Sequence, residues 1–141
     1  IVRRAVRRFA GEFIGRKLKL CYEPLNVSCV TDEKWLLFVV EQVLSNALKY
    51  TRAGSITIEL EAPKTLVIRD TGIGVAPEDL PRIFEKGYTG YNGRGDQKAS
   101  GLGLYLCRTI CKRLGHTITA SSVPDHGTAI RITLEQRQVR E

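Results

Sequence analysis

Three short clusters in this chain combine residue types that suit a nucleotide. Residues 70–74 (Asp-Thr-Gly-Ile-Gly) end an apolar run, residues 46–50 (Asn-Ala-Leu-Lys-Tyr) end a helical pattern, and residues 101–104 (Gly-Leu-Gly-Leu) open another helix. A carboxylate can accept a hydrogen bond from a base, an amide and a lysine suit a metal ion and phosphate, and a helix start can bind a triphosphate. Together the three clusters predict a nucleotide site.

The first helical pattern carries a polar stripe. Gln42, Asn46 and Lys49 are spaced so that they share one helix face, with Tyr50 beside them. Amide oxygens suit Mg²⁺, which commonly takes one or two protein oxygens together with substrate phosphates. Lys49 could neutralise phosphate, and Tyr50 offers a flat face to a base. The alternative is a solvated polar stripe with Tyr50 in the core.

Asp70 follows a strand pattern, where its carboxylate could accept a hydrogen bond from the exocyclic amine of adenine. The corresponding edge of guanine differs. Gly72 and Gly74 would let the backbone approach a ligand closely or adopt a positive φ. Because Asp-x-Gly is also common in turns, a simple turn after a strand is the alternative.

Gly101 and Gly103 lie at the start of a predicted helix, whose first N–H groups could point at phosphate. The segment is neither a dinucleotide fingerprint nor a Walker loop, because no strand precedes it and no Gly-Lys-Ser/Thr follows. Upstream, Lys86, Arg94 and Lys98 could reach the γ-phosphate from a long loop, or they are solvated loop charges.

The surrounding pattern predicts the elements that position these clusters. Helical periodicity covers residues 2–14, 32–50 and 101–114, with Thr31 or Asp32 as the N-cap of the second helix and a short helical turn at 76–84. Strand-like alternation covers 18–22, 55–61, 65–69, 118–121 and 128–134, with a turn at 124–127. This order predicts one mixed sheet with helices on one face, an α+β two-layer sandwich.

Size and composition fit one globular domain. The chain has 141 residues with 43% hydrophobic content and no methionine, so we expect it to be cut from a longer protein. No apolar stretch approaches the roughly 18–20 residues that cross a bilayer. The four cysteines lack zinc-site spacing, which favours reduced thiols over a metal pair or a disulfide. They are Cys21, Cys29, Cys107 and Cys111.

The net charge of +7 is concentrated near the N-terminus, where residues 1–20 hold seven basic residues and one acidic residue. Such a segment has three interpretations: it is a solvated helix face, it lies near an anionic membrane surface, or it binds nucleic acid. Nucleic acid is the weakest of them, because no nucleic-acid-binding motif accompanies the charge.

With these residues assembled, the chain resembles the catalytic, ATP-binding domain of bacterial sensor histidine kinases, in the GHKL superfamily. Residues 46–50 resemble its N box, 70–74 its G1 box, 82–86 its F box, 100–104 its G2 box and 127–128 its last box. Residues 84–90 with 104–107 resemble the small intramembrane-sensing kinases, which are associated with peptide-antibiotic response and a neighbouring transporter.

The resemblance implies a Bergerat ATP-binding fold with ATP and Mg²⁺ as cofactors. Asn46 and Lys49 would be catalytic, Asn46 would carry Mg²⁺, and Gln42 stands where many members have an asparagine, so its metal binding stays open. Asp70 would hold the adenine amine, and Phe84 would anchor the lid. The implied nucleotide-binding set is Asn46, Lys49, Tyr50, Asp70, Gly72, Ile73, Gly74, Phe84, Lys86, Arg94, Lys98, Gly101, Leu102, Gly103 and Thr128.

Neither His116 nor His126 has the sequence context of a phosphoacceptor histidine, so the resemblance places that histidine elsewhere in a parent protein. We therefore expect residues 1–14 to lead in from a phosphoacceptor hairpin, 15–136 to form the catalytic domain and 137–141 to be a tail. The implied partners are ATP, that hairpin, a response regulator and, through the parent, a transporter, with no nucleic acid. We expect the isolated chain to be monomeric and to belong on the cytoplasmic side of a parent anchored in the bacterial inner membrane.

Two other functions compete with the kinase domain. Hydrolytic ATPases of the superfamily place a glutamate one turn before the asparagine, whereas this chain has Gln42 there and Glu41 about 100° around the helix. A nucleotide sensor or docking module without turnover is the second alternative. It would keep ATP binding but not phosphate transfer.

Overall fold

The computed structural model describes residues 2–16, 19–22, 32–51, 54–61, 64–75, 77–86 and 103–134. These residues form a sheet layer and a helix layer. In chain order the elements are α1 (Val2–Arg8), α2 (Ala10–Arg16), β1 (Lys19–Tyr22), α3 (Glu33–Tyr50), β2 (Ser55–Glu61), β3 (Thr65–Asp70), the 3₁₀ helix η1 (Leu80–Arg82), α5 (Gly103–Leu114), β4 (Thr117–Val123) and β5 (Gly127–Thr133).

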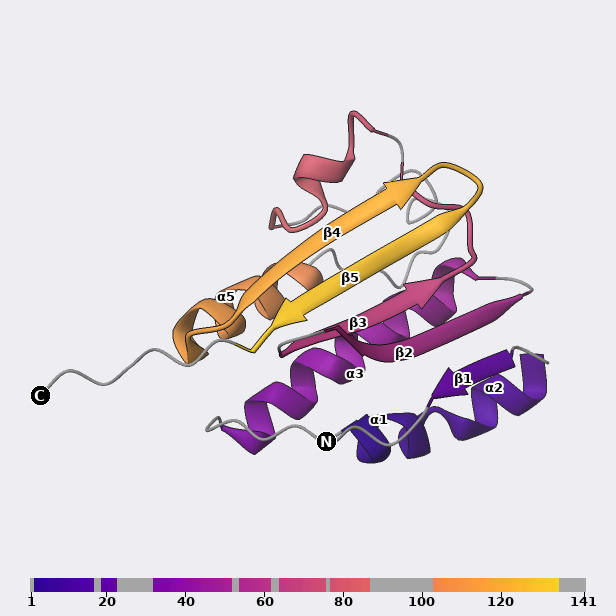
Figure 1. The fold of residues 1–141 in the computed structure, drawn as a ribbon, viewed down its shortest axis with the longest axis horizontal. Helices are drawn as coiled ribbons and strands as arrows, with labels where there is room; N and C mark the ends of the chain where they lie inside the picture. The colour runs from indigo at the N-terminus through magenta and orange to yellow at the C-terminus, as the bar shows by residue number, and fades with distance from the viewer. Residues whose placement is uncertain are drawn as a thin grey trace, which may run out of the picture.

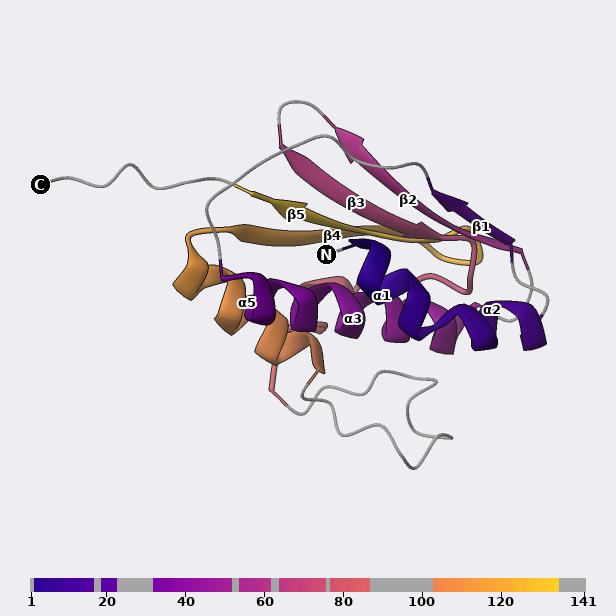
Figure 2. The ribbon, with the colours of Figure 1, turned by 90° about the horizontal axis from the view of Figure 1, so that it is seen from below.

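The sheet is mixed. Its strand order is β1-β2-β3-β5-β4, with β1 parallel to β2 and the other neighbours antiparallel (Figure 1). Seen from below, α1, α2, α3 and α5 all lie on one face of this sheet (Figure 2). The predicted α+β two-layer sandwich is therefore confirmed.

The core lies between the two layers because alternate strand residues point at the helices. Ile56 and Ile58 of β2 and Ile68 of β3 are almost completely buried on this side. They meet the apolar stripe of α3, whose Val43 and Leu44 are also buried. Each such side chain stabilises the fold by roughly 1.5–3 kcal/mol relative to an exposed one.

The N-cap of α3 is Asp32, one of the two predicted candidates. Its carboxylate accepts a hydrogen bond from the backbone N–H of Trp35 at 3.3 Å. Thr31, the other candidate, lies outside the described residues. The helix ends at Tyr50, as predicted, which places the polar stripe in its last turns.

The first helix differs from the prediction, because residues 2–14 do not form one continuous helix. The chain breaks at Phe9, whose N–H donates to the carbonyl of Val6, three residues earlier, at 3.1 Å. This tighter bond separates α1 from α2. Ala5 and Phe13 both enter the main core, so both helices pack as part of the helix layer. The proposed domain boundary at residue 14 stays a prediction.

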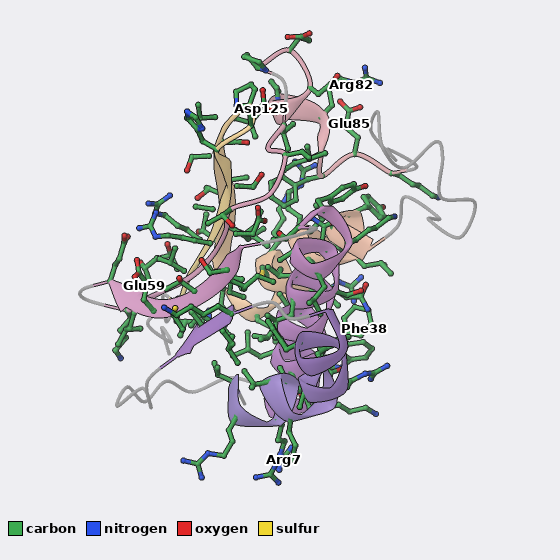
Figure 3. The ribbon with its side chains drawn as sticks, turned by 90° about the vertical axis from the view of Figure 1, so that its right-hand side faces the viewer. Arg7, Phe38, Glu59, Arg82, Glu85 and Asp125 are labelled. Atoms are coloured by element: carbon green, nitrogen blue, oxygen red, sulfur yellow. The ribbon has the colours of Figure 1, made fainter. Side chains whose placement is uncertain are left out.

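The opposite face of the sheet carries a network of charges. Arg69 of β3 contacts Glu59 at 2.8 Å and Glu61 at 3.0 Å, and Arg131 of β5 contacts Glu61 at 3.3 Å. Figure 3 shows Glu59 on this side and Phe38 of α3 on the other side of the molecule. Val67 is on the same face and is fully buried. The network thus lies on the sheet face away from the helices.

Two further expectations are that the cysteines are reduced thiols and that no segment is long enough to cross a bilayer. Cys107 and Cys111 are buried free thiols, Cys21 is a half-buried one, and Cys29 lies outside the described residues. Burial raises the pKa of the Cys107 thiol, and the neighbouring Cys111 adds to that increase. Among the described helices, none is long and apolar enough to span a bilayer.

Candidate nucleotide-binding site

Asp70 is the last residue of β3, and its side chain lies on the helix-facing side of the sheet, like that of Ile68. Its Oδ1 accepts hydrogen bonds from the backbone N–H of Gly72 at 2.9 Å and of Thr128 at 3.2 Å. In the part of the chain that the structure describes, no donor binds Oδ2. Oδ1 therefore binds the backbone of the Asp70 loop and of β5, and Oδ2 can accept a hydrogen bond from a ligand.

Burial raises the pKa of the Asp70 carboxyl above its ordinary value, although the hydrogen bonds from Gly72 and Thr128 act in the opposite direction. Desolvation disfavours the charged form, and two backbone donors only partly compensate for it. A donor from a ligand would supply the missing stabilisation. This electrostatic setting suits the recognition of an amine.

The loop at residues 70–75, which we call the Asp70 loop, needs its glycines for packing against the protein itself. A Cβ at Gly72 would collide with the backbone carbonyl of Tyr50, at the end of α3. Gly74 has a φ of +77°, and a Cβ there would lie 2.5 Å from the carbonyl oxygen of Val123. The close approach and the positive φ expected from the sequence are both present.

Hydrogen bonds join the Asp70 loop to both layers. The N–H of Ile73 donates to the carbonyl of Tyr50 at 3.3 Å, and the N–H of Asp125 donates to the carbonyl of Ile73 at 2.6 Å. Asp125 lies in the turn between β4 and β5, at the top of the view in Figure 3. The loop is thus held between the end of α3 and the β4–β5 turn.

The polar stripe of α3 is partly covered, since Gln42, Asn46, Lys49 and Tyr50 are all half-buried. The Lys49 ammonium lies 5.4 Å from the centre of the Tyr50 ring, a cation–π contact. The stripe runs along α3 to its last residue, Tyr50, and the Asp70 loop contacts Tyr50. Tyr50, the predicted base residue, therefore adjoins the loop that carries Asp70, and the predicted metal and phosphate residues precede it on the same helix.

Gln42 also reaches the first residue of α5. A Cβ built at Gly103 would lie 2.9 Å from Gln42 Oε1, so the side-chain amide packs directly against this glycine. The N–H groups at the start of a helix favour anions. The structure thus brings one predicted metal ligand and one predicted phosphate-binding glycine together.

The remaining predicted residues divide into two groups. Phe84 is buried in the main core beside Ile83, whereas Lys86 is exposed. Arg94, Lys98, Gly101 and Leu102 lie outside the described residues.

Ser122 of β4 is a site residue that the sequence analysis missed. Its hydroxyl accepts a hydrogen bond from the N–H of Val75 at 2.7 Å and lies 3.2 Å from the Thr128 hydroxyl. The alternation of β4 places Ser122 on the helix-facing side, but nothing in that pattern indicates which loop it meets. Of the two histidines, His116 is buried and His126 is exposed.

The chain is similar to known proteins over most of its length. Residues 31–138 match the family described as histidine kinase-, DNA gyrase B- and HSP90-like ATPase. The sensor histidine kinase YxdK of Bacillus subtilis is 41% identical over 121 residues, which span 79% of this chain and 37% of the relative. The sensor protein BceS of Halalkalibacterium halodurans is 42% identical over 107 residues, which span 74% of this chain and 32% of the relative.

A solved structure shares the fold. Full-length ShkA in complex with AMPPNP superposes with a TM-score of 0.79 at 22% identity, covering 93% of this chain and 28% of that one. This chain belongs to the family of histidine kinase-, DNA gyrase B- and HSP90-like ATPase domains. It spans about a third of the length of the sensor kinases that it matches. The resemblance to sensor histidine kinases that the sequence indicated is confirmed.

Proposed function

We propose that this chain is the ATP-binding catalytic domain of a sensor histidine kinase, which binds Mg·ATP and transfers its γ-phosphoryl group to a histidine elsewhere in the parent protein. The observation that carries the proposal is the half-buried Asp70 carboxylate, with Oδ1 held by two backbone N–H groups and Oδ2 bound by no donor among the described residues. The family match and the similarity to named sensor kinases support the same function.

Adenine would be held by Asp70, with its 6-amino group donating to Oδ2 and Thr128 beside it. Because the Asp70 loop is packed against Tyr50, a base in this position would lie beside the end of α3, where the Tyr50 ring offers a flat surface. Lys49 would meet the phosphates.

The amide oxygens of Gln42 and Asn46 fit Mg²⁺, since both side chains are half-buried, one turn apart on α3, and Gln42 already lies against the start of α5. In this proposal Gln42 would take the place that the resemblance gives to asparagine in many members of the family. Bound Mg²⁺ would neutralise charge on the phosphates. Asn46 and Lys49 would act by orienting the triphosphate, because positioning and charge neutralisation dominate phosphoryl transfer.

The structure offers no second functional candidate of equal support. Hydrolysis would need a carboxylate to activate water, and the nearest one on α3 is Glu41. Its Oε1 instead pairs with Arg8 of α1 at 3.2 Å. Among the described residues, Glu41 is therefore engaged by α1, and the named relatives, which are sensor histidine kinases, favour the kinase proposal.

For the parent protein we propose the phosphoacceptor hairpin and a response regulator as partners, and an anchor in the bacterial inner membrane with this domain on the cytoplasmic side. The resemblance to peptide-antibiotic-response kinases extends the proposal to a transporter that acts through the parent. Residues 1–14 would lead in from the hairpin, and the isolated chain would be monomeric.

Calorimetric titration with a non-hydrolysable ATP analogue, with and without Mg²⁺, tests the proposal, and a GTP analogue serves as the control. We expect saturable binding that prefers adenine and strengthens with Mg²⁺. Asp70→Asn should weaken binding by roughly 1–3 kcal/mol, the range for a hydrogen bond to a charged group. Equal affinity of the wild type and Asp70→Asn would contradict the assignment of Asp70 to the adenine pocket. In a separate phosphotransfer assay, ATP binding without phosphorylation of an added parent hairpin would favour a nucleotide sensor without turnover.

A further inference from the structure

The Ser122 hydroxyl uses all of its hydrogen-bonding capacity inside the protein. It donates to the backbone carbonyl of Gly127 at 2.9 Å, accepts from the N–H of Val75 at 2.7 Å and lies 3.2 Å from Thr128 Oγ1. A hydroxyl has one proton and two lone pairs. A carbonyl can only accept and an N–H can only donate, so the Ser122 proton goes to Gly127 and one lone pair goes to Val75.

This assignment decides the third contact. Only a lone pair of Ser122 is left to face Thr128, so the Thr128 hydroxyl must donate its proton to Ser122. The Thr128 oxygen is then left with lone pairs for anything on its other side. Thr128 is also the residue whose N–H binds Asp70 Oδ1, and its side chain lies on the helix-facing side of the sheet, as does that of Asp70.

We propose that Ser122 is a specificity-determining residue of the nucleotide site, which acts by holding the Thr128 proton away from the base. The edge of the site then presents two acceptors, Asp70 Oδ2 and Thr128 Oγ1. A 6-amino purine has N–H donors that match them, whereas a 6-keto purine brings a third acceptor to the same place. Specificity arises because the unmatched oxygen would lose its hydrogen bonds to water without replacement.

The second contribution of Ser122 is to the backbone. By binding Val75 and Gly127 together, it joins the end of the Asp70 loop to the first residue of β5. Asp70 and Thr128 therefore keep their relative position. This inference rests on the proposed function, because it concerns the base that the same site selects.

The test compares ADP with inosine diphosphate, which carries a carbonyl in place of the 6-amino group. Calorimetry would give the ratio of the two affinities for the wild-type chain and for Ser122→Ala. Removing the serine frees the Thr128 proton to donate to the carbonyl. We expect the preference for ADP to fall by about three- to tenfold, the effect of one hydrogen bond.

Two further variants separate selectivity from stability. Ser121→Ala is the matched control, since Ser121 is the adjacent residue and contacts Arg131 on the opposite face of the sheet. It should leave the ratio unchanged. Thr128→Val keeps the side-chain shape without the hydroxyl, and adding Ser122→Ala to it should change the ratio no further, because Ser122 acts through Thr128.

The outcomes are distinguishable. If the wild-type chain binds neither ADP nor inosine diphosphate, both the proposed function and this inference are wrong. A wild type that prefers ADP, with the same preference in a folded Ser122→Ala variant, overturns the inference alone. If Ser122→Ala does not fold, an unchanged ratio in Thr128→Val overturns it, whereas a reduced ratio supports it.

Discussion

At the residue scale, the site depends on one carboxylate whose two oxygens have different tasks. The backbone donors on Oδ1 hold the Asp70 side chain in place, and burial disfavours its charge. A folded-state pKa above the ordinary value means that Asp70 stabilises the fold at acid pH and that this contribution is lost as the pH rises through the folded-state pKa. In the proposed function, this loss of stability accompanies the presence of the anion that would bind the base.

The consequence for binding has the opposite sign to the consequence for folding. If Asp70 holds adenine as proposed, the base needs the ionised carboxylate, so we expect the affinity for ADP to fall as the pH is lowered through the raised pKa of Asp70, above the ordinary range of an aspartate. Calorimetric titrations across a pH series measure this fall. Asp70→Asn is the control, because ionisation of the ADP phosphates affects both proteins alike. Parallel pH profiles would show that Asp70 does not titrate with the ligand.

Sequence reasoning identified Asp70 and Thr128 but not Ser122. The first two belong to short patterns, whereas the proposed role of Ser122 depends on the pairing of β4 with β5 and on the contact with Val75. Such contacts join residues far apart in the chain. A strand pattern indicates which side Ser122 faces, but it does not indicate its neighbour.

At the element scale, the strands and helices were largely predictable, and their ends and joints were not. The alternation of β2 and the stripe of α3 match the structure, because burial on one face imposes both periods. The break falls at Phe9 itself, which is neither a glycine nor a proline, so the sequence pattern did not predict its position. The contact between Gln42 and Gly103 depends on how α3 packs on α5.

Two glycine substitutions should separate packing from backbone conformation. Among the described residues, a methyl group at Gly103 meets the flexible end of Gln42 alone, so Gly103→Ala should change the free energy of unfolding by less than about 1 kcal/mol. It should still weaken Mg²⁺-dependent binding of the ATP analogue, since Gln42 must move.

At Gly127 the φ is +107° and a methyl group would collide with the backbone carbonyl of Asp70. Gly127→Ala should therefore destabilise the fold by more than about 2 kcal/mol. Urea unfolding of both variants measures the difference. Equal stability losses would mean that the two glycines do not differ in this way.

At the scale of the whole molecule, the two layers enclose a core that shields its thiols. Cys107 and Cys111 lie on the inner face of α5, and burial raises the pKa of Cys111 to about 11. The Cys107 thiol also donates to the carbonyl of Val39 on α3 at 3.7 Å. Both thiols are therefore weak nucleophiles at neutral pH as long as the layers stay together.

Thiol labelling thus reports the integrity of the whole domain. We expect iodoacetamide at pH 8 to modify Cys107 and Cys111 only as fast as the domain unfolds, with both reacting together after urea is added. Mass spectrometry of the digested chain assigns each site, and half-buried Cys21 provides an internal comparison. Rapid modification of Cys107 or Cys111 in the native domain would contradict this packing.

The position of Ile73 has a mechanical consequence. Its peptide groups fasten the Asp70 loop to the end of α3 on one side and to the β4–β5 turn on the other. These two hydrogen bonds connect the end of α3 to the β4–β5 turn through a single residue of the proposed base-binding loop. Because one residue is bonded on both sides, we expect a displacement of α3 to carry the Asp70 loop and the β4–β5 turn with it, so that the loop moves without changing its internal shape.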